Sequence, residues 1–317
     1  MFEIENEQLS YLNRWRESAL EKNNESEREY YKRILYGWRV GIYPKVDILL
    51  NELKVAFINK NYDLVQHIFF TFNKKEFFCY LKCGYDHCFL VYRVIPYLCC
   101  SEFNELYRAF PENLPLSTNG YSMLVNATAL LQCILYKDKY DHQKVVEKAQ
   151  KYIDSKQPIW NRAFVASFLA ILKNDDVMLS KNLQTLCDYH SRQSISDFMK
   201  FQCQYAYGLV LLAKHSLPES VFQKVKLPEH KTFDLGYMEW LYTGHFVRQS
   251  IYNYPSPYEE LNFVYQMPLP ITNLHQPYLN NDHTPISPQK KKSYHIDTDA
   301  MNEQIVDYIL MKKKNKT

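Results

Sequence analysis

Glycine is scarce in this sequence: only 7 of its 317 residues are glycine, against about 7% in average proteins. Strand-rich folds and phosphate-binding loops use glycine for tight turns and for close approach of the backbone to a ligand. The scarcity of glycine therefore argues against a large β-sheet and against a nucleotide-binding loop. The chain is expected to run from helix to helix, and its 27 Tyr and 18 Phe supply the large apolar surface that packed helices bury.

The sequence also lacks a large excess of charge of either sign. Its formal net charge is +3, whereas nucleic-acid-binding domains present a strongly basic face, and the lysine runs 290–292 and 312–314 are interpreted as solvated. No nucleic-acid partner is therefore expected. Residues 1–7 are acidic and polar, unlike a signal peptide, so the eight cysteines are interpreted as buried thiols of a cytoplasmic protein. The most apolar region, residues 79–100, is interrupted by charges, so no membrane partner is expected.

Motifs of the common enzyme classes are missing as well. The sequence contains no Gly-x-Ser-x-Gly, Gly-x-Gly-x-x-Gly, P-loop or His-Glu-x-x-His pattern. Cys79, Cys83 and His87 follow one another at a spacing of four, but zinc sites usually contain a paired Cys-x2-Cys knuckle, so buried structural cysteines are the favoured interpretation. The polar run Asp188–Arg192 is explained by the end of a helix. We expect no metal, no cofactor and no catalytic residue.

Helical periodicity in pairs is the main pattern that the sequence does contain. Apolar residues recur at intervals of three and four in residues 46–57 and 64–69, with the polar turn 60–63 between them. The same arrangement returns at residues 121–154 and again at residues 160–190. Each of these segments predicts an antiparallel helical hairpin.

The last two hairpins also resemble each other. An offset of 37 residues aligns Ala129 with Ala166 and Tyr152 with Tyr189. A period in the thirties is typical of helix–turn–helix repeat arrays, although the tetratricopeptide consensus is absent. The sequence therefore predicts an all-α fold of stacked antiparallel hairpins, TPR-like with degenerate repeats.

Proline changes the character of the chain after Asn253. The prolines concerned are Pro255, Pro257, Pro268, Pro270, Pro277, Pro285 and Pro288. Such a stretch cannot sustain long helices, because proline lacks an N–H group and its ring clashes with the preceding turn. We expect an all-helical domain at residues 1–252 and an extended or partly disordered tail at residues 253–317, with a last small helix at Asp299–Leu310.

Two short segments are candidates for contact with a partner protein. Asp175 and Asp176 lie at the expected turn of a hairpin, although aspartate also favours turns for its own hydrogen bonds. The segment Phe233–Tyr242 mixes aromatic and acidic residues, as protein interfaces do. Its candidate contact residues are Asp234, Tyr237, Glu239 and Trp240. The alternative is that this segment only closes the end of the helical stack.

The middle of the chain carries a resemblance to a known family. Residues Ala166–Asp176 form a short helical run and a small acidic turn, the next helix closes at Asp188–His190, and Tyr205–Lys214 is an apolar run. This order resembles the immunity protein 49 family of bacterial polymorphic-toxin systems, most strongly between Ala166 and Leu217. The resemblance implies an all-α cytoplasmic antidote that binds a cognate toxin, often a nuclease, and blocks it.

Three functions remain open from the sequence. The leading hypothesis is an immunity protein that neutralises a toxin by stoichiometric binding. The second is a helical-repeat adaptor or regulatory scaffold that presents a groove to peptides. The third is an enzyme, which would require a polar pocket holding His87 or His190 beside a carboxylate. The sequence leaves the oligomeric state open.

Overall fold

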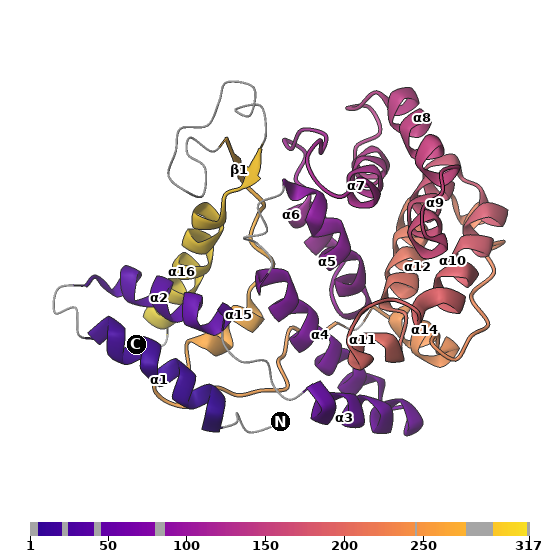
Figure 1. The fold of residues 1–317 in the computed structure, drawn as a ribbon. Coiled ribbons are helices and arrows are strands. Elements are labelled where there is room, and N and C mark those ends of the chain that lie inside the picture. The colour runs from indigo at the N-terminus through magenta and orange to yellow at the C-terminus, as the bar shows by residue number, and fades with distance from the viewer. Residues whose placement is uncertain are drawn as a thin grey trace.

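The predicted all-α class is confirmed. A computed structural model describes residues 6–20, 25–40, 46–79, 86–244, 246–276 and 294–315 of the chain. Within these ranges it contains sixteen α-helices, two short 3-10 helices and one two-stranded sheet (Figure 1). No helix in the described ranges is long and apolar enough to cross a membrane.

The helices differ widely in length along the chain. The first elements are α1 (Asn6–Leu20), α2 (Glu27–Val40), α3 (Val46–Ile58), α4 (Tyr62–Cys79), η1 (His87–Phe89), α5 (Leu90–Tyr97), η2 (Leu98–Cys100) and α6 (Asn104–Ala109). The middle elements are α7 (Ser122–Leu135), α8 (His142–Ile153), α9 (Ile159–Lys173), α10 (Asp176–His190), α11 (Asp197–Phe201) and α12 (Gln204–Ser216). The last elements are α13 (Glu219–Phe222), α14 (Leu235–Leu241), α15 (Leu261–Gln266), β1 (Leu274–His275), β2 (His295–Ile296) and α16 (Thr298–Lys314).

Helices α7 to α10 form two hairpins at the predicted places. α8 is capped by Asp141, whose carboxylate accepts a hydrogen bond from Lys144 N at 3.1 Å. α9 begins after Pro158 and ends at Asn174, which adopts the left-handed conformation with a φ of 54°. Asp175 then caps α10. α9 packs against α7, α8, α10 and α12, and this central position explains why eleven of its fifteen residues are buried.

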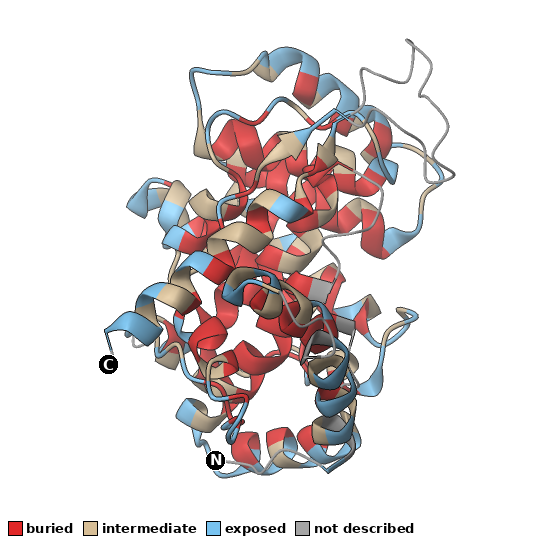
Figure 2. Ribbon diagram, turned by 90° about the vertical axis from the view of Figure 1, so that its left-hand side faces the viewer, coloured by how far each residue is buried: buried red, intermediate tan, exposed pale blue. Residues whose placement is uncertain are grey.

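The helices α4, α5 and α12 connect this stack to the N-terminal helices. α5 packs on α4 and on α12, and α12 approaches α5 so closely that a Cβ atom on Gly208 would lie 1.9 Å from the carbonyl oxygen of Ile95. Only glycine permits this approach. Figure 2 shows that buried residues run through the middle of the molecule rather than through separate cores.

The described part of the Pro-rich segment packs into this core, whereas an extended or partly disordered tail was expected for residues 253–317. Its buried side chains include Tyr254, Tyr258, Phe263, Tyr265 and Leu269. The indole Nε1 of Trp38 in α2 donates to the Tyr254 hydroxyl at 2.9 Å. Residues on both sides of position 253 therefore share one buried interior. Pro277, Pro285, Pro288 and the lysine run 290–292 lie outside the described residues.

In the Pro-rich segment, charged side chains form hydrogen bonds with backbone groups that are not hydrogen-bonded within a helix. Lys74 donates to the carbonyl oxygen of Met267, and Arg108 donates to that of Leu269. The carboxylate of Glu105 accepts a hydrogen bond from Leu269 N at 2.6 Å. Proline does exclude long helices here, as predicted. Its described residues nevertheless pack against α4 and α6, where apolar side chains are buried and the backbone of Met267 and Leu269 is hydrogen-bonded by side chains.

Helix α16 packs against α2 and α15. It extends beyond both ends of the helix expected at Asp299–Leu310. Its buried side chains are Thr298, Met301, Ile305, Val306 and Ile309. At the exposed edge Arg28 of α2 pairs with Glu303 at 2.5 Å, and Lys313 pairs with Glu27 at 2.5 Å. At least one lysine of the 312–314 run is therefore engaged within the molecule rather than fully solvated.

Candidate functional site

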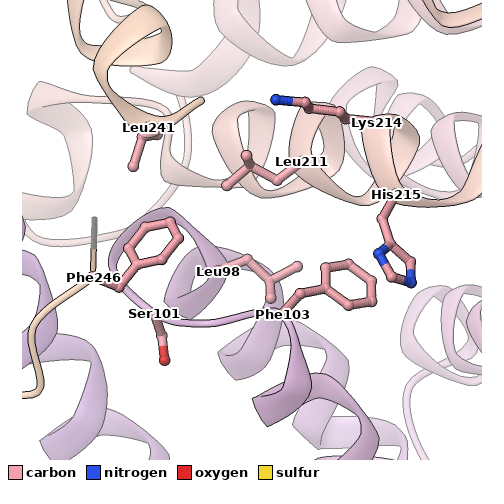
Figure 3. Close-up of a pocket in the computed structure, with 8 residues that line it drawn as sticks. All are labelled: Leu98, Ser101, Phe103, Leu211, Lys214, His215, Leu241 and Phe246. Atoms are coloured by element: carbon pink, nitrogen blue, oxygen red, sulfur yellow. The ribbon is translucent and has the colours of Figure 1, made fainter. Parts of the chain in front are cut away.

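An open pocket lies where three separate segments of the chain meet. Its walls come from η2 and the turn that follows it, from the last turns of α12, and from the end of α14 with the loop behind it (Figure 3). The lining residues are Leu98, Ser101, Phe103, Leu211, Lys214, His215, Leu241 and Phe246. Its volume is about 280 Å³. We call these eight residues the α12 groove.

The sequence of α12 explains why the groove is apolar with a basic rim. Residues 205–213 are mostly apolar, and Leu212 is fully buried in the core, whereas Leu211 faces the groove and is half-buried. Lys214 and His215 follow in the last turn of the helix, where the backbone carbonyl groups favour positive charge. The helix therefore presents an apolar side chain and two basic residues to the same opening.

One edge of the groove is an aromatic stack. The rings of Phe103 and His215 have centroids 3.6 Å apart and planes inclined by 20°. The Tyr107 hydroxyl lies 3.2 Å from Nε2 of His215. Partial burial lowers the pKa of His215 below its ordinary value. At pH 7 the imidazole is therefore mainly neutral and contributes an aromatic face rather than a charge.

The ammonium group of Lys214 is the one full charge among the eight lining residues at pH 7. In Figure 3 the Lys214 side chain extends over Leu211 toward Leu241, while the Ser101 hydroxyl points away from the other lining side chains. The Lys214 Nζ lies 4.1 Å from the centroid of the Tyr242 ring, within the range of a cation–π contact. The groove thus combines an apolar floor with a single positive charge.

Asp175 and Asp176 lie at the turn between α9 and α10, as predicted, and both are half-buried. The Asp175 carboxylate accepts a hydrogen bond from Met178 N at 2.8 Å, which caps α10. The carbonyl oxygen of Asp176 accepts a hydrogen bond from the Ser180 hydroxyl at 2.6 Å. Capping accounts for Asp175, and neither aspartate lines the α12 groove.

Tyr237 belongs to the core, which corrects its prediction as a contact residue. Its side chain is fully buried, its hydroxyl donates to the carbonyl oxygen of Cys99 at 2.7 Å, and its ring centroid lies 5.5 Å from that of Phe57. Asp234 caps α14, and its carboxylate accepts hydrogen bonds from Tyr237 N at 2.7 Å and from the Tyr62 hydroxyl at 3.1 Å. Core packing and helix capping therefore explain part of the aromatic and acidic pattern.

Glu239 and Trp240 are the predicted α14 residues that reach the surface. Glu239 is exposed, and Trp240 is half-buried with its ring stacked on Tyr237 at a centroid distance of 5.8 Å. Leu241, the next residue of α14, lines the α12 groove. The predicted segment therefore borders the groove, although the residues named from the sequence do not line it.

The other groove residues were not predicted from the sequence, because segments far apart in the chain supply them. Two signals were available. Phe103 is an isolated aromatic residue beside the polar residues Glu102 and Asn104, and Lys214 and His215 end a long apolar run. Neither signal indicates that the two segments face each other.

The histidines considered for catalysis are both buried. His87 lies beside Asp86, whose carboxylate accepts four hydrogen bonds, three of them from residues 117–119. Nε2 of His190 lies 2.7 Å from the carbonyl oxygen of Met199. Burial lowers the pKa of His87, so this residue stays neutral. These contacts hold loops to the core, and both histidines have a structural explanation.

No metal-binding cluster of three His, Cys, Asp or Glu residues occurs in the described part of the chain. Cys83 and the side chain of Cys79, which were weighed as zinc ligands with His87, lie outside the described residues. Six other cysteines are buried thiols that form no disulfide bond with another described residue, among them Cys133, Cys187 and Cys203.

The α12 groove, held between helices of the central core, is the feature from which a function is inferred. Its shape and chemistry suit an apolar group more than a charged substrate or a metal ion. No known protein family, curated protein or solved structure matches the chain.

Proposed function

We propose that this chain is an immunity protein that binds a cognate bacterial toxin in the cytoplasm and neutralises it as a stoichiometric complex. The observation that carries the proposal is the α12 groove, an open apolar pocket on a packed helical scaffold. The resemblance of residues 166–217 to immunity proteins supports a toxin, often a nuclease in that family, as the partner. Leu211, Lys214 and His215 of the groove belong to this stretch.

The composition of the groove supports a protein rather than a cofactor as its occupant. Five of its eight lining residues are Leu or Phe. Protein interfaces concentrate their binding energy in such pockets, where a few large side chains exclude water. The volume of about 280 Å³ lies just below the roughly 300–1,000 Å³ of typical small-molecule sites. One or two anchoring side chains of a partner protein would fill it.

Neutralisation in this proposal is steric. A partner anchored in the groove is held against the surface formed by α12, α14 and the turn after η2, and the bound scaffold covers the toxin's active site or obstructs its substrate. Burial of the anchor slows dissociation, which is where most differences in affinity between related complexes arise.

Co-expression with the product of the neighbouring toxin gene tests this function. The wild-type chain should restore growth and should elute with the toxin as a stoichiometric complex in size-exclusion chromatography. Phe246→Asp places a carboxylate in the groove and should abolish rescue, and its thermal unfolding temperature shows whether the variant remains folded. Leu235→Asp is the matched control, because Leu235 is an exposed apolar residue of α14 outside the groove. Failure of the wild-type chain to protect cells would contradict the immunity function.

A helical-repeat adaptor is the alternative, and the two hairpins of α7 to α10 favour it. This reading predicts a stable complex with a protein encoded nearby that is not toxic, and no protection from any neighbouring toxin. A complex that forms without rescue would support the adaptor over the immunity protein.

A further inference from the structure

The positive charge at the rim of the α12 groove is not paired with a carboxylate from the described residues. Lys214 contacts the ring of Tyr242 and forms no salt bridge with any described residue. Arg248, in the loop that follows α14, is by contrast paired with Glu102 and Glu105 at 3.1 and 3.0 Å. Lys214 is therefore available to pair with a carboxylate from outside.

The side chains around Lys214 indicate which kind of partner residue would lie next to such a carboxylate. In Figure 3 Leu211 lies below the Lys214 side chain, Leu241 lies beyond its ammonium end, and Leu98 lies across the pocket beside Phe103. None of these three leucine side chains offers a polar atom. His215 is stacked on Phe103, and partial burial lowers the pKa of its imidazole, so that it is mainly neutral at pH 7. The groove thus places one cation directly above an apolar pocket with an aromatic edge.

We infer that the α12 groove receives an aromatic or branched aliphatic side chain that the partner protein carries next to an aspartate or glutamate, and that Lys214 pairs with this acidic residue. The inference rests on the proposed function in taking a protein as the occupant. Charge complementarity decides the class of partner, since a basic flanking residue would face Lys214 and be repelled. The apolar anchor excludes water from the rim, and the ion pair is then screened less than a fully exposed pair.

Blocked dipeptides provide probes that do not depend on the toxin. Acetyl-Phe-Asp-amide, acetyl-Phe-Lys-amide and acetyl-Ala-Asp-amide would be titrated into the full chain carrying 13C-labelled leucine methyl groups. The acidic phenylalanyl peptide should shift the methyl signals of Leu98, Leu211 and Leu241. The lysyl peptide and the alanyl peptide should each bind at least five-fold more weakly, because the first lacks the carboxylate and the second lacks the anchor.

Two charge-neutralising variants test whether the preference for the acidic peptide depends on Lys214. Lys214→Gln should weaken acetyl-Phe-Asp-amide about five-fold and should reduce its preference over acetyl-Phe-Lys-amide. Lys224→Gln is the matched control, since Lys224 is an exposed lysine outside the groove, and it should leave both affinities unchanged. Equal binding of the acidic and basic peptides, equal effects of the two variants, or no methyl shift in the groove with any peptide would each overturn the inference.

The outcomes separate this inference from the proposed function. If the chain prefers the acidic peptide but does not protect cells, the inferred groove specificity is supported and the proposed immunity function is contradicted. If the chain protects cells and Lys214→Gln changes neither rescue nor peptide binding, the immunity function is supported and the inferred specificity is contradicted.

Discussion

Buried ionisable side chains form hydrogen bonds with the backbone where it leaves the helical pattern. Lys74 of α4 is fully buried, donates to the carbonyl oxygen of Met267, and lies 5.3 Å from the centroid of the Phe70 ring. Burial lowers the pKa of Lys74 to about 7, and the nearby carboxylate of Glu105 only partly opposes this shift. The protonation of one core residue therefore changes within the neutral pH range.

Replacing Lys74 should change how stability depends on pH. The unfolded chain holds the lysine proton up to a pH of about 10.5, whereas the folded chain releases it above about 7. Between these values the unfolded state binds more protons, so Lys74 makes the folded state more stable as pH rises. The unfolding free energy of the wild type minus that of Lys74→Met should increase by up to about 1.4 kcal/mol per pH unit in this window.

Denaturant titrations at pH 7.5 and 9.5 measure this difference. Subtracting the unfolding free energy of the variant from that of the wild type removes the pH dependence contributed by cysteines and tyrosines, because these residues titrate in both proteins. Lys54→Met removes an exposed lysine of α3 and should show a difference that does not grow with pH. A constant difference for Lys74→Met would contradict a buried lysine that is neutral at alkaline pH.

At the scale of elements, the contact of α16 with α2 shows which forces hold the C-terminal helix. Ile305 and Ile309 are fully buried, while the ion pairs of Arg28 with Glu303 and Asp307 lie at the surface. Exposed ion pairs contribute little and are screened by salt. We expect the apolar face of α16, rather than its charges, to hold the helix in place.

Two substitutions in α16 compare these forces. Ile305→Ala should lower the free energy of unfolding by about 2–5 kcal/mol, since it leaves a cavity in the core. Glu303→Gln should lower the free energy of unfolding several-fold less than Ile305→Ala does, and its effect should vanish in 1 M NaCl. Chemical denaturation at low and high salt gives both values. A larger loss for Glu303→Gln than for Ile305→Ala would show that the ion pairs dominate.

At the scale of the whole molecule, the C-terminal segment completes the core of the N-terminal helices. The ring of Trp38 in α2 lies 5.7 Å from that of Tyr265 in α15, and its Nε1 donates to Tyr254. Tyr258 donates to the Asn13 side chain in α1 at 2.6 Å. The first and last parts of the chain therefore depend on each other for burial.

Removal of residues 253–317 should prevent the remaining chain from folding cooperatively. The truncated chain would expose Trp38 and the apolar face of α2, so its thermal transition should broaden or disappear in circular dichroism. Supplying residues 253–317 as a separate chain should restore part of the transition. An unchanged melting temperature for residues 1–252 alone would instead support an independent N-terminal domain.

Features that depend on neighbouring residues were predictable. The turn at Asn174 and Asp175 follows from an asparagine that tolerates a positive φ and an aspartate that caps a helix. The hairpins followed from apolar spacing, and the scarcity of glycine agrees with the lack of a large sheet among the residues that the structure describes. Each of these inferences needs only the interactions within a helix or across a turn.

Features that depend on contacts between distant residues were not predictable. The same apolar spacing allows Tyr237 either to close the core or to face a partner, and only its neighbours Cys99 and Phe57 decide between them. The groove needs Phe103 and Leu211 on opposite walls, a juxtaposition that no local pattern encodes.

The sequence by itself determined the helical class and the hairpins, because backbone hydrogen bonds and apolar periodicity are local. Only the tertiary structure decided that the described part of the Pro-rich segment is largely buried and that Lys214 lies over an open pocket. Prolines prevent a helix but do not prevent burial, and whether Leu269 is buried depends on Glu105 and Arg108, far from it in the chain. Burial is a property of the packed molecule, because it depends on which surfaces meet.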